Sequence, residues 1–63
     1  MSEKEMLERY ELEIGQILVK AIDTCNLLKD GKVILAFRKL NGTIQKLNLL
    51  HARIKELNEK NND

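Results

Sequence analysis

A basic residue returns every seven positions through the second half of this 63-residue chain, beside an apolar residue with the same period. The basic series is Lys32, Lys39, Lys46, Arg53 and Lys60, and the apolar series is Val33, Leu40, Leu47 and Ile54. Seven residues make nearly two turns of α-helix, so each series forms a line along one side of a rod. This spacing predicts a long helix that lies against other helices. The spacing indicates how the chain associates with other helices, and it does not indicate a catalytic or binding reaction.

The first half of the chain carries an apolar stripe with helical spacing. Its members are Leu7, Tyr10, Ile14, Ile17, Ala21, Cys25 and Leu28. The second half extends its own apolar series in the same way, adding Ala36, Phe37, Ile44, Leu50 and Leu57. Ser2 and Glu5 form a capping box before the first stripe, and the chain contains no proline. The pattern predicts helices near residues 3–29 and 33–59, followed by a frayed polar tail at residues 60–63.

The segment Lys29-Asp30-Gly31-Lys32 separates the two stripes and predicts a turn at residues 30–32. Glycine readily adopts the left-handed backbone conformation that closes many helices. Folding the chain at Gly31 matches the two stripes layer by layer, with both stripes facing inward. The matched pairs are Leu28 with Val33, Ala21 with Leu40, Ile14 with Leu47, and Leu7 with Ile54. We therefore expect a single all-α domain over residues 1–63, an antiparallel two-helix hairpin.

Two other layouts fit part of the pattern. Asn41-Gly42 is a second helix-breaking dipeptide, and a break there would give three helices. The apolar series keeps its register across this dipeptide, and a glycine within a helix costs only about 1 kcal/mol, so we favour a continuous second helix. The other layout is one unbroken rod through Gly31 that pairs with a second chain. The helix-closing residues Asp30 and Gly31 disfavour it.

The first helix is expected to carry more apolar residues than a lone hairpin can cover. The additional residues are Leu12, Gly15, Leu18, Val19 and Ile22. A helix that is apolar around most of its circumference is buried on more than one side. A chain of this length buries only about 60% of its unfolded surface, so it needs further stabilisation. We predict that these residues form an interface and that the hairpin is a homodimer, as a four-helix bundle or another coiled-coil assembly.

Several classes of protein are disfavoured by composition. Cys25 is the only cysteine, so no disulfide forms within one chain, and Cys25 and His51 do not make a metal-ligand pair. The chain has no glycine-rich phosphate loop and no nucleophile–base arrangement, so we expect no enzymatic activity, catalytic residue, cofactor or metal. No stretch approaches the roughly 18 apolar residues of a membrane span, and the acidic start does not resemble a signal peptide. We expect a cytoplasmic protein that does not bind membranes.

The sequence has more apolar residues than a hairpin can bury and no motif of a catalytic or metal site. This combination favours a non-enzymatic protein–protein interaction module. Such a module would be a small regulator, adaptor or assembly subunit. We expect it to bind itself and another protein through its helix faces.

The alternative is a hairpin dimer that binds nucleic acid, because Lys and Arg side chains neutralise phosphates. The candidate polyanion contacts are Lys32, Arg38, Lys39, Lys46 and Arg53. The expected hairpin is similar in outline to the Rop class of plasmid RNA-binding dimers. This resemblance is one of outline alone, without shared motif residues, and it transfers no function. Glu56 and Glu59 interrupt the basic series and no aromatic residue lies within it. We therefore rank this function second and interpret the series as a solvated flank of the apolar seam.

Overall fold

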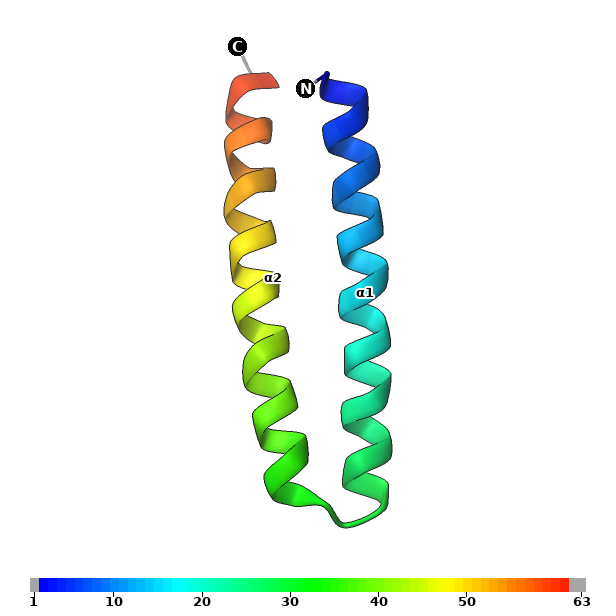
Figure 1. The fold of residues 1–63 in the computed structure, drawn as a ribbon. Helices are drawn as coiled ribbons and strands as arrows, with labels where there is room; N and C mark the ends of the chain where they lie inside the picture. Colours follow the sequence, from blue (N-terminus) through cyan, green and yellow to red (C-terminus); the bar gives the residue numbers. More distant parts are fainter. Residues whose placement is uncertain (1, 62–63) are drawn as a thin grey trace.

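The protein is a hairpin of two long antiparallel helices, described by a computed structural model over residues 2–61. Helix α1 spans Glu3–Lys29 and helix α2 spans Val33–Asn61. The helices lie side by side, with both chain ends at one end of the molecule and the turn at the other (Figure 1). This arrangement confirms the predicted all-α hairpin and excludes the unbroken rod. Helix α2 runs without interruption through Asn41-Gly42.

The start of α1 and the turn are closed by local hydrogen bonds. The Ser2 Oγ accepts a hydrogen bond of 3.2 Å from the Glu5 backbone N–H, as expected for an N-cap. At the turn, Gly31 has a φ of 75°. The Gly31 N–H donates to the Leu28 carbonyl at 3.0 Å, and the Lys32 N–H donates to the Leu27 carbonyl at 2.9 Å. These two bonds form a Schellman motif, which ends α1 and reverses the chain.

The C-terminal end of α2 lies further along the chain than the sequence predicts. The helix extends through Asn61, two residues beyond the predicted end, so Lys60 and Asn61 are helical instead of frayed. The Asn61 Nδ2 donates a hydrogen bond of 3.3 Å to the Glu3 Oε1, which joins the two free ends of the hairpin. The remaining predicted tail residues, 62 and 63, lie outside the described part of the chain.

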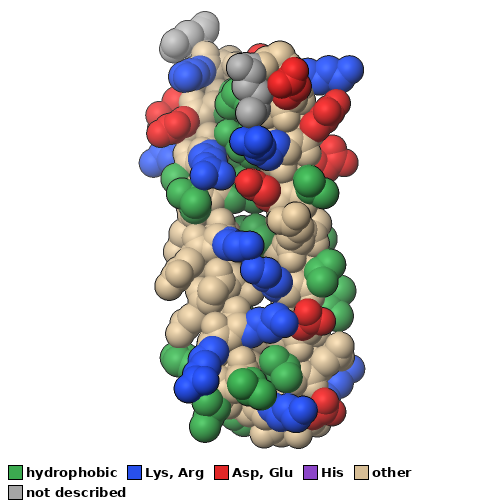
Figure 2. Space-filling model, in the orientation of Figure 1, with side chains coloured by type: hydrophobic (Ala, Val, Ile, Leu, Met, Phe, Trp, Pro, Cys, Tyr) green, Lys and Arg blue, Asp and Glu red, His purple; other side chains and the backbone are tan. Residues whose placement is uncertain are grey.

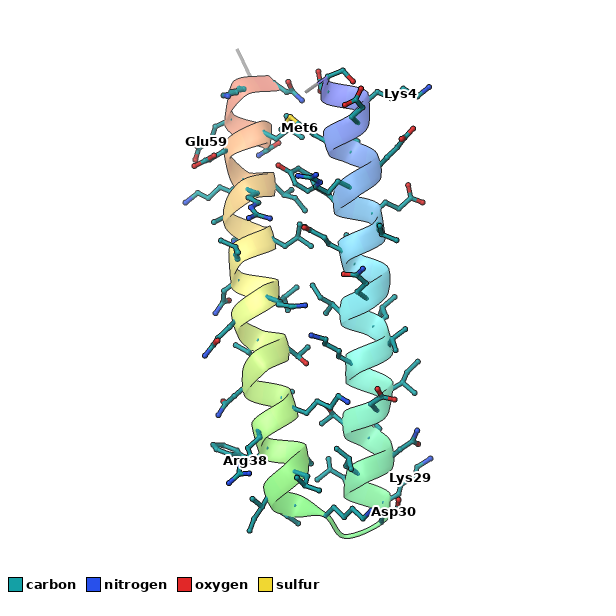
Figure 3. All side chains as sticks on the ribbon, viewed as in Figure 1. Lys4, Met6, Lys29, Asp30, Arg38 and Glu59 are labelled. Atoms are coloured by element: carbon teal, nitrogen blue, oxygen red, sulfur yellow. The ribbon has the colours of Figure 1, made fainter. Side chains whose placement is uncertain are left out.

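Few side chains are fully buried between the helices. The only described residues that are almost fully buried are Ala36 and Leu50, at 2% and 3% exposed, and Thr24 and Thr43, both at 5%. Each threonine hydroxyl donates to the carbonyl four residues earlier in its own helix, at 2.9 Å for Thr24 and 2.8 Å for Thr43. Because these side chains are small and their hydroxyls are satisfied, the helices can pack closely there. Half-buried residues complete the contact. They include Met6, whose side chain points towards α2 (Figure 3), and Tyr10, Ile17, Leu27 and Leu57.

The matched pairs predicted to form the inward core do not lie between the helices. Their large members are between 39% and 64% exposed, and they are Leu7, Ile14, Leu28, Val33, Leu40, Leu47 and Ile54. The physical reason is a rotation of each helix about its own axis. The small residues Thr24, Ala36 and Thr43 occupy the closest approach, and the neighbouring line of large apolar side chains is turned to one side. The predicted core is therefore an open surface of the hairpin.

The hairpin is a narrow rod. Its principal extents are 48 × 17 × 15 Å and its radius of gyration is 14.7 Å. A compact domain of this length has a radius of gyration of about 11 Å. Neither helix, within residues 2–61, has a stretch long and apolar enough to cross a membrane.

Candidate protein-interaction surface

Exposed apolar side chains of both helices line one side of the hairpin, and we call this side the apolar face. Helix α1 contributes Leu7, Ile14, Leu18, Ala21, Cys25 and Leu28, and α2 contributes Val33, Phe37, Leu40, Ile44, Leu47 and Ile54. A shallow hollow near the turn is lined by Thr24 and Leu28 from α1 and by Val33, Ala36, Phe37 and Leu40 from α2, so both helices meet on this side. The seven-residue spacing carries the same side along the full length of the helices.

Among the described residues, the apolar face holds ten of the sixteen large apolar side chains that are exposed. Ten of its side chains are large, and each is 39% to 64% exposed. Burying the exposed half of such a side chain contributes about 1 kcal/mol, so covering the whole face would contribute on the order of 10 kcal/mol per chain. By comparison, Leu50 is the only large apolar side chain among residues 2–61 that the hairpin buries almost completely.

The opposite broad side of the hairpin is charged, and we call it the charged face. Lys39 Nζ lies 3.3 Å from Asp23 Oδ2, and Arg53 Nη1 lies 3.5 Å from Glu13 Oε1. Basic side chains follow one another down the middle of this side (Figure 2). Both ion pairs join α1 to α2 and remain substantially exposed to solvent. At such exposure each pair contributes only about 0–1 kcal/mol to stability.

Two lysines from different helices meet on the charged face. The ammonium of Lys46 lies beside that of Lys20 and lowers the pKa of Lys20, with smaller contributions from partial burial and from Lys39. A positive charge placed beside Lys20 disfavours the protonated state of Lys20. Lys20 was not among the residues predicted from the basic series. Its place in the charged face follows only when the helices are paired.

The structure distributes the five predicted polyanion contacts over different surroundings. Lys39, Lys46 and Arg53 line hollows of the charged face. The Arg38 side chain lies on the side of α2 away from α1 (Figure 3), and Lys32 lies in the turn. Two of the five are therefore engaged with carboxylates of α1, and the set does not form one continuous ridge.

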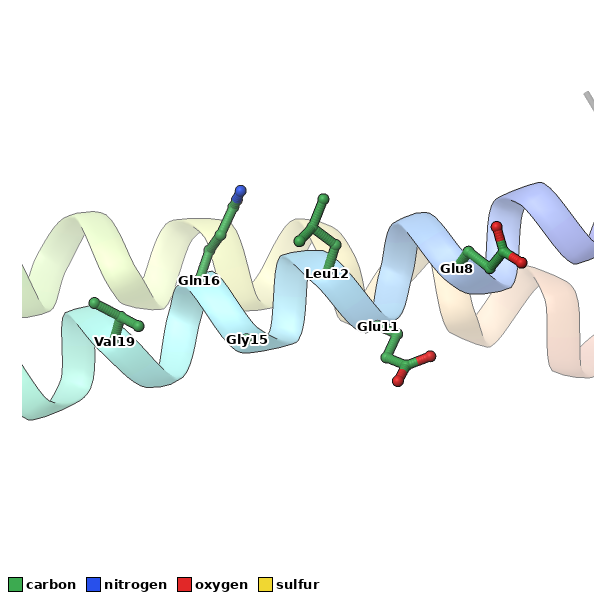
Figure 4. A pocket seen from close by; sticks show the side chains of 6 residues that line it. All are labelled: Glu8, Glu11, Leu12, Gly15, Gln16 and Val19. Atoms are coloured by element: carbon green, nitrogen blue, oxygen red, sulfur yellow. The ribbon is translucent and has the colours of Figure 1, made fainter.

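The predicted interface residues of α1 divide between two surfaces. Leu12, Val19 and Ile22 are exposed on the outer side of α1, around Gly15, and we call this the outer surface of α1. A Cβ atom at Gly15 would meet nothing within 4 Å. Figure 4 shows the shallow hollow at Gly15 with Glu8 and Glu11 on its rim. Leu18, in contrast, belongs to the margin of the apolar face. An interface on the outer surface of α1 stays a prediction.

The described residues bring few potential metal ligands together. Within residues 2–61, no three His, Cys, Asp or Glu side chains come together in a group that could hold a metal ion. The Cys25 thiol is exposed at the margin of the apolar face. His51 is exposed on α2 at the other margin.

Comparisons of this chain with protein families, with curated proteins and with solved structures gave no match.

Proposed function

We propose that this protein is a non-enzymatic interaction module, a small regulator, adaptor or assembly subunit that works as a homodimer. Two copies would stack their apolar faces to form a four-helix bundle. The observation that carries this proposal is the apolar face itself, which contains large side chains of both helices along the length of the molecule. A helical hairpin with one such side needs a second layer to bury it.

The accessible surface of the hairpin supports a second layer of this size. The chain of 7.3 kDa exposes 5239 Å². A compact monomer of the same mass exposes about 4,200 Å², so the hairpin exposes an excess of roughly 1,000 Å². Stable interfaces bury about 800 Å² or more on each partner, and permanent homodimers often bury more. The excess therefore matches what a stable dimer needs.

The division of apolar residues within each helix favours the same assembly. One line, with Ala36, Thr43 and Leu50 in α2, is covered by the hairpin's other helix. The adjacent line, with Leu40 and Leu47, is left uncovered. Two adjacent apolar lines on one helix are the pattern of a bundle helix that touches two neighbours. Stacking the apolar faces would bury the second line and leave both charged faces in water.

A protein partner would then meet surfaces that the dimer leaves open. The outer surface of α1 carries the exposed side chains of Leu12, Val19 and Ile22 and stays accessible in this assembly. We assign it to partner binding because scattered single apolar residues are common on surfaces, whereas these share one side of a helix.

The experiment that tests the dimer compares two charge insertions by sedimentation velocity. Leu47→Glu places a carboxylate in the middle of the apolar face, and we expect it to abolish the dimer. Val19→Glu is the matched control, because Val19 is at least as exposed as Leu47 but lies on the outer surface of α1. It should leave the dimer intact. The reverse result would move the interface to the outer surface of α1.

Nucleic-acid binding is the second candidate function, and one observation favours it. Lys20 adds a basic group from α1 beside Lys39, Lys46 and Arg53, and an anion near Lys20 and Lys46 would relieve their repulsion. Against it, Asp23 and Glu13 already pair with two of these groups. The test is binding of a labelled RNA duplex at increasing salt, because phosphate contacts weaken steeply with ionic strength. Tight binding at physiological salt that the double change Lys39→Glu, Lys46→Glu abolishes would favour this candidate over ours.

A further inference from the structure

The two margins of the apolar face change character along the hairpin. The margin of α1 carries Lys4, Glu11, Leu18 and Cys25, spaced by seven, and the margin of α2 carries Phe37, Ile44, His51 and Asn58, with the same spacing. In the half near the turn, the margins are apolar on both helices. In the half near the chain ends, they are polar, and Lys55 lies one turn beyond His51. The margins thus distinguish the two ends of the face.

A symmetric dimer that stacks two such faces has two arrangements. A two-fold axis along the hairpin puts both turns at the same end and lays α1 over the partner's α2. A two-fold axis across the hairpin puts the turns at opposite ends and lays α1 over the partner's α1. In both cases the interface is built from the same patch on each copy, as two-fold symmetry requires. The line of α2 residues through Leu40 and Leu47 is apolar throughout and does not distinguish the two arrangements. The residues at the margins of the apolar face do distinguish them.

The bonds between the helices determine which residues lie at the same height. These bonds join Glu3 to Asn61, Glu13 to Arg53 and Asp23 to Lys39. By this register, Glu11 lies level with the segment of α2 between His51 and Lys55. Leu18 lies level with the turn of helix after Ile44, and Cys25 lies level with the turn after Phe37.

With the turns at the same end, the apolar residues of each margin meet apolar residues of the partner's margin, and the acidic residue meets a basic segment. Glu11 would face the His51–Lys55 segment of the partner, which brings a carboxylate to a basic group. Leu18 would face the partner's Ile44, and Cys25 would face the partner's Phe37. Every apolar margin residue is then covered by another, and the acidic residue gains a basic neighbour.

With the turns at opposite ends, polar residues of one margin meet apolar residues of the partner's margin. Glu11 would lie level with the stretch between Leu18 and Cys25 of the partner, which places a carboxylate against apolar surface. Phe37 would lie beside the partner's Asn58, and Ile44 beside the partner's His51. Such contacts leave polar groups without partners and apolar groups in contact with water, which disfavours this arrangement.

We propose that the second copy lies on the apolar face with its turn at the same end, so that α1 of each copy packs against α2 of the other. This inference rests on the homodimer proposed above and adds its orientation. The bundle then has both turns at one end and all four chain ends at the other.

Distances between spin labels at the turn test the orientation. A single nitroxide is attached at Asp30→Cys in a Cys25→Ala background, because Asp30 is exposed and lies in the turn (Figure 3). Double electron–electron resonance should give a distance under about 30 Å, since stacked helices lie about 10 Å apart and the label arms add the rest. Turns at opposite ends would give a distance close to the 48 Å length of the hairpin, and this result would overturn the proposal.

A mixed sample provides the matched control. Copies labelled at Asp30→Cys are combined with copies labelled at Glu59→Cys, which lies on the outer side of α2 near the chain ends (Figure 3). The same-end dimer predicts a long distance between the two unlike labels, and the opposite-end dimer predicts a short one. If the protein has the mass of a dimer but shows the opposite pattern of distances, the proposed orientation is wrong and the homodimer stands. A monomer mass without any intermolecular distance would overturn the homodimer as well.

Discussion

The Arg53 guanidinium lies 3.5 Å from the Glu13 carboxylate, between residues 40 positions apart in the sequence. This pair shows that the basic series of α2 points towards the charged face. Successive residues of a helix are rotated by about 100°, so with Arg53 on one side, Ile54 points towards the other. Ile54 and the residues spaced by seven from it are accordingly found on the apolar face. The two series that run side by side in the sequence are therefore found on opposite sides of the hairpin.

The buried side chain of Leu50 should dominate the stability of the contact between the helices. We expect Leu50→Ala to lower the free energy of unfolding by about 2–5 kcal/mol, because the substitution leaves a cavity in a site that is 3% exposed. Leu49→Ala is the matched control, since Leu49 is more than half exposed. Its effect should stay within about 0.5 kcal/mol. Urea unfolding at one fixed protein concentration measures both, and equal effects would contradict the assigned helix contact.

Replacing Gly31 and Gly42 by alanine should change the stability of the protein in opposite directions. Gly31 has a φ of 75°, which alanine adopts at a cost of about 1–2 kcal/mol, so Gly31→Ala should destabilise the hairpin. Gly42 lies within α2 with nothing within 4 Å of an added Cβ, so Gly42→Ala should stabilise the protein by up to about 1 kcal/mol. Thermal unfolding followed by circular dichroism compares the two variants. A loss of stability in Gly42→Ala would argue for a break at Asn41-Gly42.

Reversing the charge of Lys39 and of Lys46, which are neighbours in the basic series, should change the stability of the protein in opposite directions. Lys39→Glu would place two carboxylates together at Asp23 and should destabilise the protein by about 0.5 kcal/mol. Lys46→Glu would replace a repelling neighbour of Lys20 by an attracting one and should raise the urea midpoint. Added salt should reduce both effects, because exposed charges are screened. Identical changes in the two variants would contradict the placement of Lys20 beside Lys46.

The pKa of Lys20 offers a direct readout of that placement. Lys46→Gln removes the neighbouring ammonium, so the pKa of Lys20 should rise towards the ordinary lysine value of about 10.4. In the wild type the pKa is lower in the folded than in the unfolded state, so protonation of Lys20 disfavours folding. This penalty is present at neutral pH and is relieved as the pH rises through the folded pKa. The free energy of unfolding of the wild type should therefore rise relative to Lys46→Gln in the alkaline range below about pH 10.4. Carbon-detected NMR titration of the lysine Cε atoms measures the pKa itself, and an unchanged value would count against the contact.

The sequence was sufficient to predict the hairpin, because its signals are local. The capping residue Ser2 and the helix-closing Gly31 act on their own surroundings, and their geometry depends little on the rest of the chain. The continuity of α2 through Gly42 was predicted from the register of the apolar series on both sides of it.

The rotation of each helix was not predictable from hydrophobicity alone. Leu40 and Leu47 are the more apolar residues, so the sequence placed them between the helices and gave Thr43 no role. In the structure Thr43 is buried, because a small side chain with a satisfied hydroxyl allows a closer approach than a leucine does. The choice between two adjacent lines depends on how both helices fit together. That fit also determines the position of Lys20, which no period in the sequence marks.

Intermolecular NOE measurement tests the central claim, that a second copy covers the apolar face. Copies labelled with ¹³C are mixed with unlabelled copies, and only NOEs between the two kinds are detected. We predict such NOEs from the methyl groups of Leu40 and Leu47, and none from Leu12 on the outer surface of α1. A folded protein with no intermolecular NOE at Leu40 and Leu47, or with NOEs confined to the outer surface of α1, would contradict the proposed dimer.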